Sequence, residues 1–388
     1  MGRKALEFFM DLNECRQTLD KIDDEILRLF LKRMGIVSAV ADFKRANNLP
    51  VLQKDREREI LARIGENSTE ELSGYSRLLF SSIMDISRSY QATRNSLPGK
   101  LSEKIKDAIA ATNNRFPKNC VVACQGIDGA YSSLACDKIL PGSNILYFKS
   151  FEGVFSAIDK GLCKYGILPI ENCIHGSVNQ VYDLMKNFSF YIVRSLKLKI
   201  NHSLLAKNGA TLSDITDIYS HEQAIGQCSQ FLKEHPDIRV HICENTAVAA
   251  KLVAESENPG AASFSSPECA SLYGLSVVCD GVADSDSNFT RFICISKDLE
   301  IYPGANKVSL MLHALNKPGA LYSLISKFAV LGINITKLES RPIAGRDFEY
   351  LFYFDIDASV YSDEVLRLLD EICSDSEDAV FLGSYTEI

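Results

Sequence analysis

The sequence lacks any apolar run near the roughly 20 residues of a membrane span, and residues 1–10 lack an apolar core long enough for a secretion signal. With 42 Lys and Arg against 50 Asp and Glu, it also lacks a basic patch typical of nucleic-acid binding. Its twelve cysteines form no CxxC pair, and no Cys/His cluster has ligand spacing. We therefore expect a cytoplasmic protein with reduced thiols, no metal, no cofactor and a disordered lead-in at 1–10.

The length of 388 residues predicts two or three domains. Hydrophobic residues make up 46% and charged residues 24% of the chain, which is ordinary for a globular protein. The evidence for separate domains therefore comes from changes of periodicity along the chain.

Two cations lie where an apolar helix face is expected. Residues 11 to about 46 are predicted to form one long helix, because apolar side chains recur at spacings of three and four. These are Leu19, Ile22, Ile26, Leu29, Val37 and Val40. Arg33 and Lys44 are about 1100° apart at 100° per residue, so they lie within roughly 20° of one azimuth on this stripe. Unpaired cations on a buried face would cost several kcal/mol each, which favours a small polycarboxylate between them.

A single arginine on an apolar stripe more often extends to water or pairs with a nearby carboxylate. Two further predicted helices, 54–64 and 69–94, place more polar groups beside apolar faces. These groups are Arg56, Glu57, Ser87 and Gln91. Cations, one acid, a hydroxyl and an amide together favour a binding site, with a plain antiparallel coiled coil as the alternative.

The first helix is too long for its own globule. At 1.5 Å per residue it would extend about 54 Å, and some 90 residues in three helices cannot cover that length. We expect a second copy of the chain to cover it, giving a homodimer or a dimer of dimers.

The middle of the chain changes to short apolar runs alternating with helical stretches, after a polar linker at 96–118 that has room for one short helix. Strand–helix alternation over about 175 residues predicts α/β layers in two lobes. From residue 305 onward the order of predicted elements is βαββαβ, which indicates a ferredoxin-like sandwich.

Polar residues at strand ends mark a candidate site in the middle unit. Glu171 and Asn172 end an apolar strand in the string PIEN, and Thr290 and Arg291 begin another in NFTRF. Between them lie Ser220 and His221 in YSH, and Gln227 in the next helix. Each taken alone more often caps a loop than catalyses a reaction.

Together these strings resemble prephenate dehydratase, whose TRF motif is specific. The first three helices resemble the all-helical chorismate mutases. The last unit resembles an ACT domain, with GAL at 319–321 and ESRP at 339–342. The resemblance implies a bifunctional family with an all-α mutase forming an intertwined dimer at 10–95, a two-lobed α/β dehydratase at 119–297 and an α+β ferredoxin-like ACT regulatory domain at 305–385.

The mutase resemblance implies a pocket for chorismate. Arg16 from the other protomer, Arg33 and Arg56 would bind the two carboxylates. Lys44 and Gln91 would meet the ether oxygen. The remaining roles fall to Glu57 on the ring hydroxyl, Ser87 as support for a carboxylate, and Gln53 near the hydroxyl in place of an acid. The rearrangement is intramolecular, so charge stabilisation and positioning are enough.

The dehydratase resemblance implies that Thr290 assists departure of the hydroxyl group of prephenate. Asn172 and Arg291 would fix the substrate, and the cleft would also contain Glu171, Ser220, His221 and Gln227. Cys173 stands where the family usually has Ser or Thr.

The ACT resemblance implies L-phenylalanine as a feedback inhibitor. The implied effector residues are Gly319, Ala320, Leu321, Glu339, Ser340, Arg341 and Pro342. Gly319 permits close approach of the backbone to a ligand at a strand-to-helix turn.

Two other functions are compatible with parts of the pattern. A two-lobed sensor with an ACT module would leave the Thr290–Arg291 pair and the cations of the first helix without a purpose. A mutase joined to a dehydrogenase would need a GxGxxG cradle, and the nearest string, Gly126-Ile-Asp-Gly129, lacks that spacing.

Overall fold

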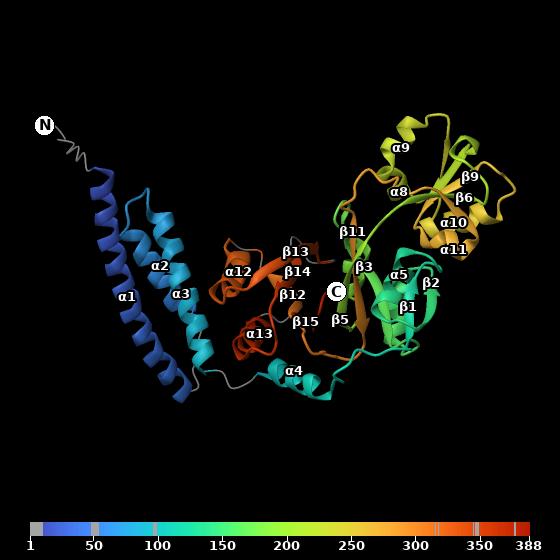
Figure 1. Ribbon diagram of the computed structural model, residues 1–388. Coiled ribbons are helices and arrows are strands. Elements are labelled where there is room, and N and C mark those ends of the chain that lie inside the picture. The colour runs from blue at the N-terminus through green and yellow to red at the C-terminus, as the bar shows by residue number, and fades with distance from the viewer. Residues whose placement is uncertain are drawn as a thin grey trace.

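The computed structural model describes residues 11–47, 54–95, 99–314, 316, 318–343, 345, 349–375 and 378–388. The lead-in expected at 1–10 and the candidate Gln53 lie outside these ranges. Figure 1 shows the first three helices at one end, a two-lobed α/β unit at the other, and the C-terminal unit between them. No helix in the described ranges is long and apolar enough to cross a membrane.

The amino-terminal unit consists of α1 (Leu12–Ala46), α2 (Lys54–Glu66) and α3 (Ser73–Asn95). Asp11 and Glu14 form a capping box at the start of α1, which satisfies backbone N–H groups that have no partner within the helix. The long first helix confirms the prediction from periodicity, whereas α3 begins four residues later than expected.

The predicted linker contains a docked helix, α4 (Lys100–Ala111). Backbone nitrogens of Gly99 and Ser102 donate to the carboxylate of Asp370 at 2.9 and 3.1 Å. A carboxylate at a helix N-terminus is favourable, because it accepts from unpaired N–H groups at the positive end of the helix dipole. Ile105 is fully buried in the core of the C-terminal unit, so this polar stretch is part of that unit's packing.

Two sheets confirm the predicted lobes of the middle unit. The first sheet has the order β2-β1-β3-β11-β5, with β4 paired to β3, and the second has the order β10-β6-β9-β7-β8. The first sheet comprises β1 (Val121–Gln125), β2 (Asn144–Phe148), β3 (Tyr165–Asn172), β4 (Gly176–Ser177), β5 (Tyr191–Lys199) and β11 (Phe289–Ser296). The second comprises β6 (Ser203–Lys207), β7 (Asp217–Ser220), β8 (Arg239–Ile242), β9 (Ala261–Ser265) and β10 (Leu275–Cys279).

Helices cover both sheets of this unit. They are α5 (Tyr131–Ile139), α6 (Phe151–Asp159), α7 (Asn179–Met185), α8 (Glu222–Gln227), α9 (Ser229–Glu234), α10 (Thr246–Glu255) and α11 (Glu268–Tyr273), with a 3₁₀ turn at Leu212–Asp214. The chain passes from the first sheet to the second after β5 and returns before β11. The loops at these two crossings therefore lie beside the ends of β3 and β11.

The C-terminal unit has the predicted βαββαβ order. Its elements are β12 (Lys307–Ala314), α12 (Ala320–Val330), β13 (Asn334–Pro342), β14 (Tyr350–Asp357), α13 (Asp363–Asp375) and β15 (Val380–Tyr385). The strand order β13-β14-β12-β15 is wholly antiparallel, and both helices contribute to one core.

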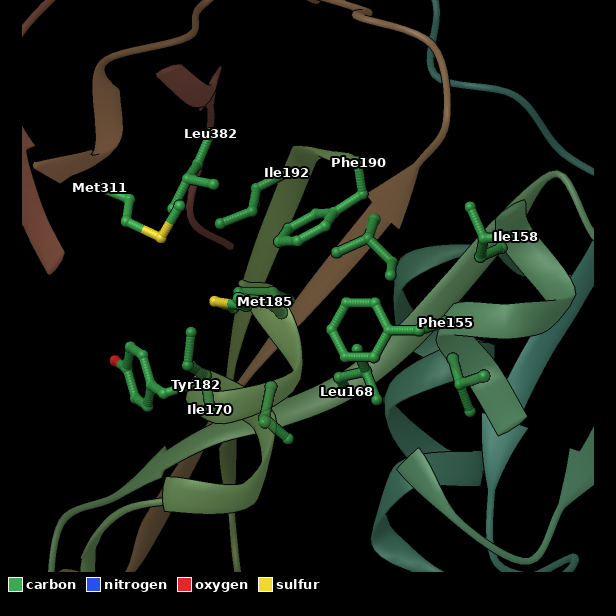
Figure 2. Packing of buried hydrophobic residues seen from close by; sticks show 14 of the residues in the cluster. Phe155, Ile158, Leu168, Ile170, Tyr182, Met185, Phe190, Ile192, Met311 and Leu382 are labelled. Atoms are coloured by element: carbon green, nitrogen blue, oxygen red, sulfur yellow. The ribbon is translucent and has the colours of Figure 1, made fainter. Parts of the chain in front are cut away.

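The C-terminal sheet packs on the α/β unit through a shared hydrophobic core. Figure 2 shows Met311 and Leu382 beside Phe190 and Ile192 in the same cluster of buried side chains. The last residues extend this contact, since the backbone nitrogens of Ser195 and Lys197 donate to the carbonyl groups of Thr386 and Ile388 at 3.1 and 3.0 Å.

Candidate active sites

A cavity of about 470 Å³ lies among α1, α2 and α3. Its lining includes six of the predicted residues: Arg33, Lys44, Arg56, Glu57, Ser87 and Gln91. The remaining lining side chains are Arg88, Ile36, Val37, Val40, Ile60 and Met84. The two cations of the first helix therefore face a shared cavity, as the near-equal azimuths predicted.

Helix periodicity explains how these residues meet. Val37, Ala41 and Lys44 are the buried residues of α1, and their spacings of four and three put them on one face. Ser87 and Gln91, four apart on α3, are also buried, with only 4% and 7% of their surfaces exposed. The cavity thus lies between the stripe of α1 and the facing stripe of α3.

Charge in this cavity is poorly solvated. Burial lowers the pKa of the Lys44 ammonium, and the carboxylate of Glu57 acts in the opposite direction. Burial also lowers the pKa of Arg33. Burial is the main cause of both shifts, and Lys44 has only 8% of its surface exposed, so water screens its interaction with an anionic ligand only weakly.

Hydrogen bonds fix part of this lining before any ligand arrives. Ser87 donates to the carbonyl oxygen of Ile83 at 2.6 Å and accepts a hydrogen bond from Arg33. Oε1 of Gln91 is buried and, within the described part of the chain, has no hydrogen-bond partner. A buried amide oxygen without a partner is costly, so a polar ligand in the cavity would satisfy it.

Of the predicted residues that the structure describes, Arg16 is not in this cavity, and one charged residue of the lining, Arg88, was not predicted. Arg16 is exposed on α1, 17 residues before Arg33, which is roughly 25 Å along the helix axis. Gln53 lies outside the described residues. Arg88 was missed, although its position between Ser87 and Gln91 on one helical turn was a signal in the sequence.

The second site lies where β3 ends beside the start of β11. Asn172 pairs in register with Thr290, and its Nδ2 donates to Thr290 Oγ1 at 2.9 Å. The same nitrogen donates to Asn288 Oδ1 at 2.8 Å. Asn172 Oδ1 accepts from the backbone nitrogens of Ile174 and His175, each at 3.0 Å. The amide is therefore held with its nitrogen directed at the Thr290 hydroxyl.

The second lobe contributes Gln227 to this network. Gln227 Oε1 accepts from Asn288 Nδ2 at 2.8 Å and contacts His202 Nε2 at 2.9 Å. Because an amide oxygen only accepts, the proton of the imidazole lies on Nε2. Burial lowers the pKa of His202, which favours the neutral ring. His202 and Asn288 belong to the two crossings between sheets, and sequence reasoning missed both as site residues, although Asn288 is the first residue of the string NFTRF.

His221 lies at the N-cap of α8, where its Nδ1 accepts from the backbone nitrogen of Gln223 at 3.2 Å. Burial lowers the pKa of His221, Glu222 raises it, and His175 lowers it further. His221 therefore favours the neutral form. The Cys173 thiol bonds the backbone where the chain returns from the second sheet to β11. It donates to the carbonyl oxygen of Ser287 at 3.0 Å and accepts from the backbone nitrogen of Phe289 at 3.1 Å.

Three residues that were predicted to bind prephenate have side chains bonded to groups other than Thr290 in this structure. Glu171 and Arg291 are paired in register on the same two strands, and neighbouring residues of a strand face opposite sides of the sheet. Ser220 is fully buried in the second lobe and donates to the carbonyl oxygen of Phe264 at 2.7 Å.

Glu171 and Arg291 contact the C-terminal sheet instead. Lys337 of β13 lies 2.7 Å from Glu171. The Arg291 guanidinium, 8% exposed, donates to Asp355 Oδ2 at 2.5 Å and to the Tyr385 hydroxyl at 2.7 Å. Its Nε lies 3.0 Å from Glu387. One face of β3 and β11 thus carries the Asn172–Thr290 pair, and the other carries ion pairs to the C-terminal unit.

The predicted effector residues lie at two places in the C-terminal unit. Gly319 adopts a left-handed backbone conformation (φ 80°) as the N-cap of α12, which begins with Ala320 and Leu321. Glu339 and Arg341 lie on β13 and bond the α/β unit: Ser177 Oγ is 2.6 Å from Glu339, and Arg341 binds Asp183 at 2.6 Å. Ser340 and Pro342 alternate with them on the exposed face of β13.

Comparison with known proteins identifies two families. The prephenate dehydratase family model matches residues 122–300, and the chorismate mutase type II model matches residues 15–92. The bifunctional chorismate mutase/prephenate dehydratase of Aquifex aeolicus (strain VF5) is 30% identical over 376 residues, covering 97% of this chain and 98% of the relative. The protein of that description from Escherichia coli (strain K12) is 30% identical over 380 residues, covering 95% of each.

A solved structure is similar to part of the chain. The prephenate dehydratase of Arthrobacter aurescens, in complex with L-Phe, has a TM-score of 0.63 and 27% identity, covering 69% of this chain and 89% of that chain.

Proposed function

The chain belongs to the family of bifunctional chorismate mutase/prephenate dehydratases of phenylalanine biosynthesis, and on this premise we propose which residues carry out each reaction. One chain rearranges chorismate to prephenate in the helical cavity and converts prephenate to phenylpyruvate beside Thr290. The observation that carries the first assignment is the cavity itself, where, among the described residues, cations from three helices meet a buried amide and a single acid.

In the mutase cavity the chain binds a dicarboxylate and stabilises charge that develops during bond rearrangement. Arg33 and Arg56 bind the carboxylates, and Ser87 holds the Arg33 guanidinium. Lys44 and the amide of Gln91 donate to the ether oxygen as it becomes negative. Since both groups are buried, their hydrogen bonds act in a medium of low dielectric constant. Glu57 accepts from the ring hydroxyl.

Arg16 completes the cavity of a second copy in an intertwined dimer. Support comes from α1, whose side chains Leu19, Ile22, Ile26 and Leu29 are each about half exposed in the single chain. A helix with an uncovered apolar face requires a partner, and Arg16 is too far from Arg33 to reach its own cavity.

A mixing experiment tests this dimer. Arg16→Ala and Lys44→Ala variants should each lack mutase activity. After unfolding and refolding together, half of the dimers contain one chain of each kind, and one of their two cavities is intact. Recovery of roughly a quarter of the wild-type activity is expected from the two-fold symmetry. No recovery, in a mixture shown to contain mixed dimers, would overturn the shared site.

In the dehydratase, Thr290 donates its proton to the hydroxyl group of prephenate, which leaves as water. The C–C bond to the carboxylate breaks in the same step, so that carbon dioxide is released and the ring becomes aromatic. Asn172 Nδ2 donates to Thr290 Oγ1 and so stabilises negative charge on that oxygen. Gln227 and His221 bind the substrate from the second lobe. Glu171, Ser220 and Arg291 are not part of this assignment, because their side chains are engaged elsewhere.

The C-terminal unit, which we assign as an ACT domain, binds L-phenylalanine as feedback inhibitor. Support comes from its βαββαβ order, from the similarity to a dehydratase solved with L-Phe, and from the ion pairs that join it to the strands of the dehydratase site. Movement of β13 or β14 would shift β3 and β11, so effector binding can alter the population of active geometry at Asn172 and Thr290.

The central experiment supplies chorismate to the purified chain and follows prephenate and phenylpyruvate, with and without phenylalanine. Both products are expected, with phenylpyruvate formation suppressed by phenylalanine. Leu321→Ala and Ser340→Ala should relieve that suppression without changing the uninhibited rate. Persistence of full inhibition in both variants would remove the case for this effector site.

A further inference from the structure

Arg88 is a charged residue of the mutase cavity to which the preceding assignment gives no role. It lies on α3 beside Ser87 and lines the cavity. Its guanidinium bonds two carboxylates at once, Glu57 on α2 and Asp85 on its own helix. Arg88 and Glu57 are each 27% exposed and Asp85 is 14% exposed, so the cluster is largely withdrawn from water.

The charges of the lining show why this contact matters. Among the residues that the structure describes, its cations are Arg33, Lys44, Arg56 and Arg88, and Glu57 is its one acid. Asp85 lines a separate groove of about 310 Å³ between α3 and α12. Arg88 therefore lies in the wall between the cavity and this groove, with an acid on each side.

Glu57 has a second cation within electrostatic reach. Its carboxylate raises the pKa of Lys44, opposing the larger effect of burial. A carboxylate that turned toward Lys44 would occupy the cation assigned to the ether oxygen and would repel the carboxylates of an incoming dianion. The bond to Arg88 instead holds Glu57 at the α3 wall.

We propose that Arg88 is a positioning residue of the mutase: it holds Glu57 against α3, so that this acid accepts from the substrate hydroxyl and does not compete with the dicarboxylate for Lys44. This proposal rests on the assignment of the cavity as the mutase site. The proposal also bears on substrate orientation, because the position of Glu57 decides which end of chorismate faces α2.

A double-mutant cycle tests whether Arg88 acts through Glu57. Arg88→Met, Arg88→Lys, Glu57→Gln and the double variant Arg88→Met/Glu57→Gln are compared with wild type by kcat and KM for chorismate. We expect Arg88→Met to lower kcat/KM by about tenfold to hundredfold, mostly through KM, and Arg88→Lys to recover most of the loss, as expected for coupled charged neighbours. In the Glu57→Gln background, Arg88→Met should change kcat/KM less than about twofold.

Two controls separate this role from a general structural one. Arg58→Gln removes an exposed i,i+3 pair with Asp55 from α2 and should leave the mutase unchanged. Conversion of prephenate by the same variants reports whether the rest of the chain is folded. An Arg88→Met variant within twofold of wild type, or additive losses in the double variant, would overturn the proposal. If Arg88→Met fails to fold, Arg88→Lys decides the matter: a folded Arg88→Lys variant that keeps most of the wild-type kcat/KM would support the proposal, and a folded one that does not would refute it. Lack of mutase activity in the wild-type chain would instead refute the assignment of the cavity.

Discussion

Replacing Thr290 by valine isolates the hydroxyl group of the dehydratase site, because valine keeps the branched shape that suits a strand. Asn172 Nδ2 would lose its bond to Thr290 Oγ1, 2.9 Å in the structure, and would keep the bond to Asn288 Oδ1 at 2.8 Å. No buried donor is left without a partner, so the free energy of unfolding should fall by only about 1 kcal/mol.

The effect on the reaction should be much larger. A positioned proton donor contributes about 10²- to 10⁴-fold to a rate. We therefore expect Thr290→Val to slow the conversion of prephenate to phenylpyruvate by that factor, equivalent to roughly 2.7–5.4 kcal/mol of activation free energy. Thr290→Ser, which retains the hydroxyl, should stay within about tenfold of wild type.

The assay measures phenylpyruvate formed from purified prephenate, with the mutase rate recorded on the same preparation. Loss of the first activity with an unchanged second activity is the expected result. A valine variant that forms phenylpyruvate at the wild-type rate would refute the role of the hydroxyl. Equal loss of both activities would show that the substitution disturbs the whole chain.

Three further predictions follow from burial and close approach. Because burial lowers the pKa of Lys44 below the ordinary 10.5, Lys44 should lose its proton, and the mutase its activity, at a correspondingly lower pH. Lys44→Arg should shift this alkaline loss of activity to higher pH. An unshifted pH profile would assign the loss to another group. Because burial lowers the pKa of His202, the unfolded state binds the proton more readily than the folded state, so the free energy of unfolding should decrease as pH falls below about 6.5. In urea titrations at pH 5 to 7, His202→Asn should flatten this pH dependence. An unaltered dependence in the variant would contradict the prediction. A Cβ at Gly383, where φ is 140°, would lie 2.2 Å from the carbonyl oxygen of Ile192, so Gly383→Ala should lower the free energy of unfolding by about 2–4 kcal/mol. Gly35→Ala places its Cβ in open space on α1 and should not lower the free energy of unfolding. Equal denaturation midpoints for the two variants would count against this prediction.

Periodicity and motif order were enough to predict much of this molecule. The stripe of α1 and the i,i+4 spacing of Ser87 and Gln91 correctly predicted which side chains share a cavity, because helix geometry alone fixes those azimuths. The string TRF and its companions indicated the family, which the relatives confirm over nearly the whole chain. The βαββαβ order of the C-terminal unit also agrees with the sequence.

Long-range packing explains what the sequence did not predict. The stretch around Ile105 was expected to be mainly linker because it is polar. It docks as α4 because Ile105, with Leu101, Ala108 and Ile109, packs on the C-terminal core and two of its N–H groups bond Asp370. The inward direction of Ser220 depends on the carbonyl group of Phe264, which is distant in sequence. Thr290 and Arg291 face opposite sides of the sheet because side chains alternate along a strand, so the shared motif TRF does not imply a shared site.

The alternation along β11 also constrains how this chain can change over evolutionary time. On one side Thr290 accepts from Asn172, where we propose that the dehydratase reaction takes place, and on the other side Arg291 binds the neighbouring unit. Inserting or deleting a single residue ahead of this pair would exchange the two sides, burying the hydroxyl in the domain contact and bringing the guanidinium to the substrate. A change in the length of the loop before Asn288 is therefore compatible with both contacts only if the strand keeps its phase.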